Sequence, residues 1–167
     1  PGSVGGYFTA ALEQQGIRCV SGGGEDLLQT EELAVLRSLL QVISNPRQDI
    51  PLIAVLASPL FCFTADDLAQ FRGKRRGGCV YDALLQSDSG KTAEFLTLLA
   101  QLRKTARMES LSVLLDRIFR RTRIDSIYAA MPGGILRREN LQTFYALAVD
   151  FEAAGRRDLE QFLDFLT

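Results

Sequence analysis

The side chains best suited to acid–base or metal chemistry in this 167-residue chain are two pairs of neighbouring carboxylates, Glu31–Glu32 and Asp66–Asp67. Adjacent residues of a helix point in different directions, so neither pair converges on one reacting atom by itself. Both pairs lie where a helix is expected to begin, and negative charge there interacts favourably with the helix dipole. Since no third ligand accompanies either pair, we expect neither a catalytic nor a metal site.

The sequence contains no histidine. This excludes Ser-His-Asp and Cys-His triads and removes the usual general base at neutral pH. The three cysteines, Cys19, Cys62 and Cys79, are widely spaced and odd in number, which fits neither a disulfide framework nor a zinc site. We expect reduced thiols in a cytoplasmic protein, with no catalytic residue, no metal and no cofactor in this chain.

Two glycine-containing motifs could bind phosphate. Gly90-Lys91-Thr92 resembles the end of a P-loop, but Leu85 stands where that motif requires its first glycine. The run Gly22-Gly23-Gly24 lacks the spacing of a dinucleotide-binding fingerprint and follows no convincing strand. We therefore interpret Lys91 as an exposed residue at a helix start and the glycine run as a connector.

One group of basic residues, Arg72, Lys74, Arg75 and Arg76, lies in the glycine-rich segment 72–78, which we expect to be a loop. A basic loop can lie against DNA phosphates, where each contact adds salt dependence rather than sequence preference. A solvated surface turn explains the same residues equally well. The sequence leaves these two interpretations open.

A second basic group consists of four arginines, Arg117, Arg120, Arg121 and Arg123. Arg117 and Arg121 are four residues apart and share a helical face. Because carboxylates at positions 116 and 125 are close in the sequence, surface ion pairing is the favoured interpretation of this group.

Helical periodicity dominates the chain, with clear start and stop signals. Ranges such as 7–15, 92–107, 124–130 and 138–154 carry apolar residues at helical spacing, and Thr30, Ser110 and Asp158 are expected N-caps. The segment 50–57 is apolar almost all round, which predicts a buried helix capped by Asp49. We predict a mostly α, bundle-like single domain over residues 1–167, with eight or nine helices and little or no sheet.

The overall composition is that of an ordinary globular protein, with 47% hydrophobic and 23% charged residues. The net charge is -1, so attraction to nucleic acid would have to come from local patches. No apolar run approaches the length of a membrane span, and we expect no membrane association. The chain begins at Pro1 rather than at a methionine, and we expect it to be a piece of a longer protein.

Two stretches of sequence are similar to a known family. The first has a glycine-containing segment, a helix, the turn Asn45-Pro46-Arg47-Gln48-Asp49, and a helix ending in Ser58-Pro59. It resembles the start of the 2B region of UvrD/Rep-like superfamily 1 DNA helicases. The second, Pro132-Gly133-Gly134 with Arg137 and Asn140-Leu141, is similar to a P-G-G-x-x-R-x-x-N-L helix of that region.

These details are most similar to the A subunit of AddAB-type ATP-dependent helicase–nucleases, and the resemblance covers nearly the whole chain in the expected order. It implies a helical insertion domain in a DNA translocase of double-strand break repair. The implied partners are forked or duplex-end DNA, the motor domains of the same chain and a second helicase–nuclease subunit. The ATP, Mg²⁺ and nuclease motifs are absent from this sequence, so the resemblance places them elsewhere in the intact protein.

One departure bears on DNA binding. In UvrD-like members a G-I-G turn grips duplex backbone, whereas the corresponding segment here, 59–64, has no glycine. Bulky residues keep phosphate away from the backbone, so we expect Lys74, Arg75 and Arg76 to be the DNA contacts instead. Arg137 is a weaker candidate, because it can also fix a helix start or pair with a carboxylate. The alternative function is a protein-docking module without DNA contact, and an independent small enzyme is disfavoured.

Overall fold

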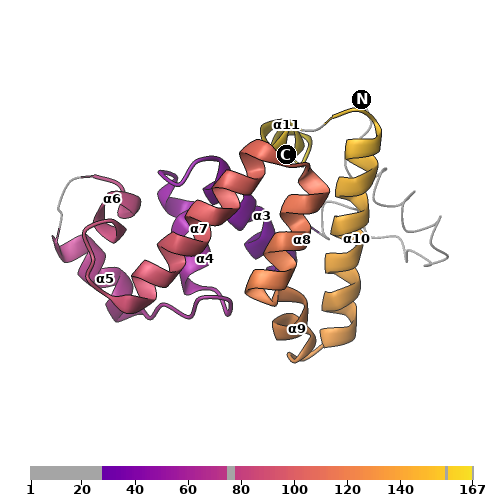
Figure 1. The fold of residues 1–167 in the computed structure, drawn as a ribbon. Helices are drawn as coiled ribbons and strands as arrows, with labels where there is room; N and C mark the ends of the chain where they lie inside the picture. The colour runs from indigo at the N-terminus through magenta and orange to yellow at the C-terminus, as the bar shows by residue number, and fades with distance from the viewer. Residues whose placement is uncertain (1–27, 75–77, 157, 167) are drawn as a thin grey trace.

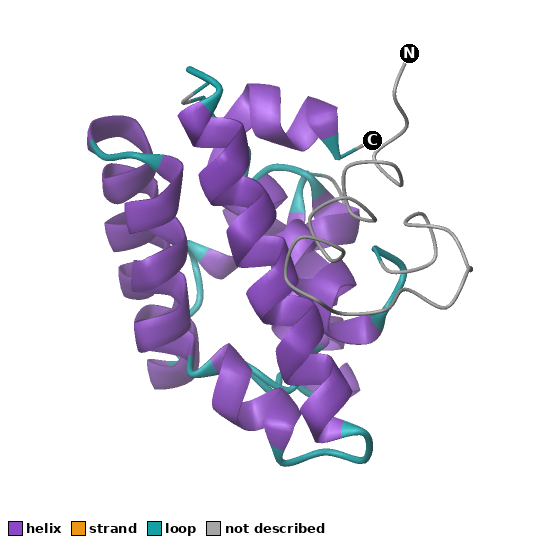
Figure 2. Ribbon diagram, turned by 90° about the vertical axis from the view of Figure 1, so that its right-hand side faces the viewer, coloured by secondary structure: helices purple, strands orange, loops and turns teal. Residues whose placement is uncertain are grey.

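The computed structural model describes residues 28–74, 78–156 and 158–166, without the side chains of residues 72–74. Over these ranges the fold consists of nine helices and no strand (Figures 1 and 2), which confirms the predicted mostly α architecture. The helices are α3 (Glu31–Ser44), α4 (Asp49–Ala57), α5 (Ala65–Lys74), α6 (Val80–Leu84), α7 (Gly90–Met108), α8 (Leu111–Thr122), α9 (Ile124–Ala129), α10 (Gly134–Ala153) and α11 (Leu159–Phe165).

Helix α3 lies at the centre of the fold and contacts α4, α7, α10 and α11 (Figure 1). Its buried side chains therefore extend around more than one face of the helix. The buried apolar residues of α3 are Leu33, Val35, Leu36, Leu39, Leu40, Val42 and Ile43. Helix α3 therefore contributes to the packing of these four helices.

Helices α8 and α10 pack side by side, and α11 closes one end of the core (Figure 1). Three buried aromatic rings join α10 to α11: Phe162 lies 5.7 Å from Phe144 and 5.1 Å from Phe151, centroid to centroid. Both pairs have the edge-to-face geometry that aromatic rings favour. These three rings therefore belong to the hydrophobic core.

Local signals set most helix boundaries as predicted. Thr30, Ser110 and Asp158 are the N-cap residues of α3, α8 and α11, and the Asp158 carboxylate accepts a hydrogen bond from the Glu160 amide at 3.1 Å. Gly155 follows α10 with φ 85°, a conformation that is cheap for glycine. The Asp158 carboxylate and Gly155 therefore account for where α11 begins and where α10 ends.

The start of α5 is a reciprocal capping arrangement. The Thr64 amide donates to Asp67 Oδ2 at 2.8 Å, and the Asp67 amide donates to Thr64 Oγ1 at 3.2 Å. The hydrogen bonds from Thr64, backbone first, lower the pKa of the Asp67 carboxyl below its usual value. This is the helix-start role expected for the Asp66–Asp67 pair.

The predictions for α4 were partly wrong. Ile50 is 84% exposed, and only Leu52, Val55 and Leu56 of this helix are buried, because α4 packs on one side against α3 and α6. Asp49 is the first residue of α4 rather than its cap. Its Oδ1 instead accepts from the Val80 amide at 2.8 Å, so Asp49 caps the start of α6.

Several expectations fall outside the described residues, namely the helix over 7–15, Cys19 and the glycine run 22–24. Within the described part, no helix combines the length and apolar character needed to cross a membrane. Cys62 and Cys79 are free thiols in this part of the chain.

Candidate nucleic-acid interface

Arg137, the weaker of the DNA-contact candidates, lies in the first turn of α10 and reaches back to the start of α3. Its Nη1 donates to Glu32 Oε2 at 2.8 Å and lies 3.2 Å from Glu31 Oε2. Its Nε donates to the Pro132 carbonyl at 3.2 Å. The guanidinium is thus held by two carboxylates and a carbonyl, which favours the structural interpretation of Arg137 over DNA contact.

The rest of this polar cluster is buried between α3, α9 and α10. Asn140 Nδ2 donates to Glu32 Oε1 at 2.7 Å, so both oxygens of a carboxylate whose side chain is only 2% exposed have a partner. Tyr128 is fully buried beneath the Arg137 guanidinium, which lies 5.7 Å from the centre of its ring. We call Glu31, Glu32, Tyr128, Arg137 and Asn140 the α3–α10 polar cluster.

Burial raises the pKa of the Tyr128 hydroxyl to about 12, and the Glu31 and Glu32 carboxylates add to the shift. The hydroxyl has no hydrogen-bond partner among the residues that the structure describes. Tyr128 therefore stays protonated at neutral pH and serves as packing under Arg137.

The P-G-G turn explains why Arg137 can reach α3. Gly133 has φ 72°, and a Cβ on Gly134 would collide with the Ala129 carbonyl at the end of α9. Only glycine at position 134 lets α10 start this close to α9. The P-G-G motif, on which the family resemblance rests, therefore places Arg137 and Asn140 next to Glu32.

The strongest DNA-contact candidates lie largely outside the described residues. Lys74 is the last residue of α5, and Arg75 and Arg76 follow in the segment 75–77 that the structure does not describe. The prediction that the loop begins at Arg72 was wrong, since α5 continues through residues 72–74. A single glycine costs a helix only about 1 kcal/mol, and arginine and lysine are good helix formers.

The second basic group partly follows its predicted surface ion pairing. Arg120 lies 4.0 Å from Asp116 across one helical turn. Arg117 instead donates to Thr105 Oγ1 of α7 at 2.6 Å. Arg123 takes a left-handed conformation, φ 55°, at the junction of α8 and α9. Arg117 and Arg120 are thus engaged with neighbouring helices or turns.

The P-loop-like residue Lys91 lies near the start of α7, as expected, but it is not free. Its Nζ donates to the Cys62 carbonyl at 2.6 Å, lies 3.5 Å from Asp67, and lies 4.6 Å from the centre of the Phe63 ring. These contacts tie α7 to the connection between α4 and α5. Lys91 therefore has a structural role that the sequence did not indicate.

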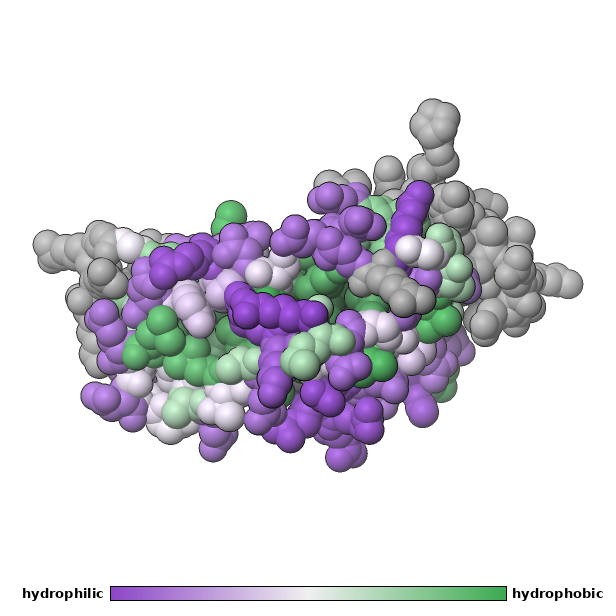
Figure 3. Space-filling model, turned by 45° about the horizontal axis from the view of Figure 1, so that its top comes forward, coloured by the Kyte–Doolittle hydropathy of each residue, from purple (hydrophilic) through white to green (hydrophobic). Residues whose placement is uncertain are grey.

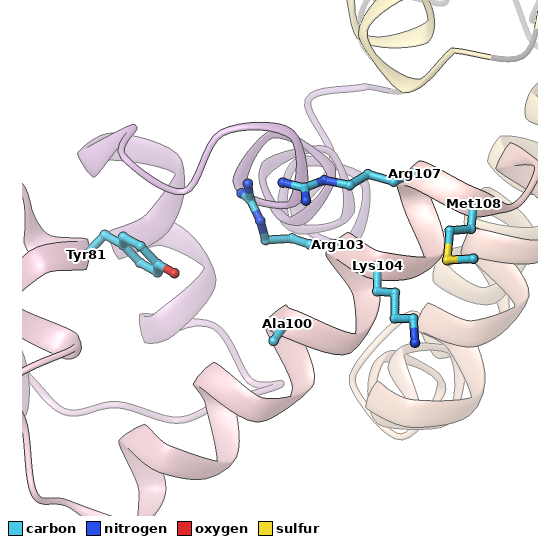
Figure 4. Close-up of a pocket in the computed structure, with 6 residues that line it drawn as sticks. All are labelled: Tyr81, Ala100, Arg103, Lys104, Arg107 and Met108. Atoms are coloured by element: carbon cyan, nitrogen blue, oxygen red, sulfur yellow. The ribbon is translucent and has the colours of Figure 1, made fainter.

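Sequence reasoning missed a basic groove of about 410 Å³ between α6 and α7 (Figure 4). It is lined by Tyr81, Ala100, Arg103, Lys104, Arg107 and Met108. The signal in the sequence is three cations at positions 103, 104 and 107, at helical spacing. Spacing alone does not show that an aromatic ring lies near these cations, because Tyr81 comes from another helix.

The described residues hold no group of three or more cysteine, aspartate or glutamate side chains that could bind a metal ion. Figure 3 shows one face of the molecule, where hydrophilic side chains surround smaller hydrophobic patches. Together with the helical architecture, these features define a small all-α domain whose polar clusters hold helices together.

No protein-family model matches the chain. It is 38% identical over 162 residues to the A subunit of the ATP-dependent helicase/nuclease of Carboxydothermus hydrogenoformans, covering 93% of this chain and 14% of that protein. The protein of the same name from Lactobacillus johnsonii is 42% identical over 148 residues, covering 85% and 12%. That from Geobacillus thermodenitrificans is 38% identical over 168 residues, covering 93% and 13%.

This chain is therefore homologous to one segment of the ATP-dependent helicase/nuclease A subunits, which confirms the resemblance carried by its motifs. It spans only 12% to 14% of the length of these three relatives. What the relatives' names describe is an activity of proteins many times longer than this chain.

Proposed function

We propose that this chain is the 2B-like accessory domain of an ATP-dependent helicase/nuclease of the A type, and that it positions duplex DNA for the motor domains. The observation that carries this proposal is the homology to A subunits, which extends over 85% to 93% of the chain. The motor, the nuclease, ATP and Mg²⁺ are assigned to the rest of the intact protein. The domain itself is non-catalytic in this proposal.

The mechanism is electrostatic positioning. Basic side chains hold the phosphates of the duplex while the motor pulls one strand, and such contacts fix orientation without reading sequence. Lys74 at the end of α5, together with Arg75 and Arg76, forms the proposed duplex contact. Arg137 is assigned to the α3–α10 polar cluster, because its charge is neutralised by Glu31 and Glu32.

The intact protein is proposed to act in double-strand break repair in the cytoplasm, with forked or duplex-end DNA as its substrate. Its proposed protein partners are the motor domains of the same chain and a second helicase–nuclease subunit. These assignments follow from the family and from the names of the relatives, which describe an ATP-dependent helicase and nuclease.

The test is fluorescence anisotropy of a labelled forked duplex titrated with the 167-residue chain at roughly 50 and 200 mM salt. Each phosphate contact contributes about 0.9 to the slope of log affinity against log salt on duplex DNA. The variant Lys74→Ala/Arg75→Ala/Arg76→Ala is therefore expected to reduce the slope by up to about 2.7. No binding by the unmodified chain at the lower salt concentration would overturn direct duplex positioning by this domain.

A matched control removes the same charge elsewhere. Arg120, Arg121 and Arg138 are exposed, and among the described residues the long Arg120–Asp116 contact is the only ion pair that involves them. Their triple substitution by alanine should leave the slope nearly unchanged if the duplex contact lies at residues 74–76. An equal loss in both triple variants would mean that only overall charge matters.

The second candidate function is a protein-docking module, and exposed apolar residues at the start of α10 favour it. Ile135 is 82% exposed and Leu136 is 63% exposed, next to the P-G-G turn. Under this alternative, Ile135 and Leu136 pack against another domain of the intact protein. The basic residues 74–76 then only keep the surface hydrated. Failure of the forked duplex to bind at low salt would favour this candidate.

A further inference from the structure

The groove between α6 and α7 combines an aromatic ring, cations and open space. Figure 4 shows Tyr81 facing α7 from α6, while Arg103 and Arg107 extend from the same side of α7 toward the end of α3. Ala100, one turn earlier on α7, has too short a side chain to fill the space in front of the ring. The groove is therefore hollow where the aromatic side chain faces it.

The positive charge of the groove is not neutralised by ion pairs. None of Arg103, Lys104 and Arg107 forms an ion pair with a carboxylate of the part of the chain that the structure describes. Arg103 Nη1 donates to the Ser44 carbonyl at the end of α3, in a long contact of 3.4 Å. Glu160 reaches the same end of α3 through the Ser44 hydroxyl, but it is not within ion-pair distance of either arginine.

Arg47 and Arg137, by contrast, are held in ion pairs. Arg47 pairs with Asp82 at 2.9 Å, and Arg137 pairs with Glu31 and Glu32. Arg103 and Arg107 are four residues apart on one helix, where like charges repel and weaken the helix. A bound anion would remove that repulsion and would use the guanidinium donors that the Ser44 carbonyl leaves free.

The size and the chemistry of the groove fit one strand of a polynucleotide better than a duplex. About 410 Å³ admits a group of nucleotide size but not the width of a double helix. Proteins that bind single strands combine cations along the backbone with aromatic rings on which bases stack. Lys104, which extends from the other side of α7 in Figure 4, offers a third cation to a strand that leaves the groove across the helix.

We propose that this groove binds single-stranded DNA, with Arg103 and Arg107 on phosphates and Tyr81 packed against a base. The proposal rests on the proposed DNA-positioning function and deepens it by giving the separated strand its own path. The duplex contact at residues 74–76 and the strand contact in the groove are then two sites of one domain.

The test compares a labelled fifteen-nucleotide thymidine oligomer with the forked duplex, using the 167-residue chain, by anisotropy at several salt concentrations. Arg103→Gln/Arg107→Gln keeps the aliphatic stems and the helix propensity. It should reduce the oligomer's salt slope by about 1.4, because each single-strand contact contributes about 0.7. The control Arg121→Gln/Arg138→Gln removes equal charge from exposed positions outside the groove and should leave the slope unchanged.

The aromatic contribution is tested by Tyr81→Ala and Tyr81→Phe. Loss of one stacked base lowers affinity about fivefold or more, so Tyr81→Ala should bind the oligomer correspondingly weaker while Tyr81→Phe retains affinity. Circular dichroism of each variant establishes that the helices are intact. An equal loss in Tyr81→Ala and Tyr81→Phe, with folding retained, would overturn the stacking contact.

The two proposals fail separately. Two results would overturn the single-strand site and leave duplex positioning intact. In the first, the forked duplex binds but the oligomer does not. In the second, the oligomer binds equally well to the Arg103/Arg107 variant. Binding of the oligomer through the groove without binding of a blunt duplex would support the groove and overturn duplex positioning. Absence of both kinds of binding at the lowest salt concentration would overturn both proposals.

Discussion

Arg137 could stabilise the fold or contact DNA, and replacing it by methionine separates these two roles. This substitution is the most informative change in the chain. Methionine keeps an unbranched side chain of similar length and removes the charge. It leaves the Glu32 carboxylate, which is 2% exposed, without the guanidinium at 2.8 Å. The remaining partner of that carboxylate is Asn140 at 2.7 Å.

The magnitude follows from the burial of the pair. Removing one member of a buried ion pair costs about 3–5 kcal/mol, because the other charge stays buried without compensation. The Arg137 side chain is 25% exposed, so water can approach Glu32 in the variant and the lower end applies. We expect Arg137→Met to lower the free energy of unfolding by about 3 kcal/mol, or Tm by about 6–12 °C for a domain of this size.

The assay is urea denaturation followed by far-ultraviolet circular dichroism, with Arg138→Met as the matched control. Arg138 is the next residue of α10, is exposed and has no ion-pair partner in the described ranges, so its substitution should change stability by less than about 0.5 kcal/mol. Glu32→Gln/Arg137→Met removes both charges and should recover about 2 kcal/mol of the loss. A loss below about 1 kcal/mol in Arg137→Met, together with weaker binding of forked DNA, would refute the structural assignment and return Arg137 to the DNA interface.

Three further predictions concern stability. Gly134→Ala should lower the free energy of unfolding by about 3 kcal/mol, because the new Cβ collides with the Ala129 carbonyl, and urea denaturation that shows a loss below about 1 kcal/mol would contradict this contact. Asp49→Ala should cost about 1 kcal/mol through loss of the α6 cap, measured in the same way, with no loss expected at the exposed neighbour Ile50→Ala. Tyr128 has a pKa raised to about 12, so the folded state holds its proton more tightly than the unfolded state, whose pKa is about 10. Stability should therefore be constant below about pH 10 and fall as pH rises toward 12. Tyr128→Phe should reduce this fall in denaturation curves across that range, and the part that remains comes from Tyr145, whose pKa burial also raises.

The helices of this chain were predictable to a large extent because their limits depend on neighbours in the sequence. A cap such as Asp158 and a stop such as Gly155 act within one turn, and apolar spacing predicts which side of a helix is buried. Apolar content alone was less informative. It predicted a helix over 50–57 buried all round, whereas Ile50 is exposed because α4 has neighbours on one side only.

The polar contacts could not be predicted in the same way because they join residues that are far apart in the chain. In the sequence, Glu32 is only a negative charge that is favourable at a helix start. It becomes the buried partner of Arg137 and Asn140 because α10 packs against α3, although Arg137 is 105 residues away along the chain. Asp49 likewise has the local pattern of a cap for its own helix and instead caps a helix that begins 31 residues later. Spacing in the sequence identifies residues able to make such contacts but not their partners.

The same reasoning changes which basic residues are available for DNA. A count of charges gives 19 lysines and arginines against 20 carboxylates and indicates no attraction to a polyanion. The structure removes Arg137, Arg47 and Lys91 from the available set, because each of them forms an ion pair with a carboxylate. It leaves Arg103 and Arg107 beside an aromatic groove without an ion pair in the described chain. Since local charge rather than net charge governs contact with phosphates, a nearly neutral domain can still bind DNA at a defined place.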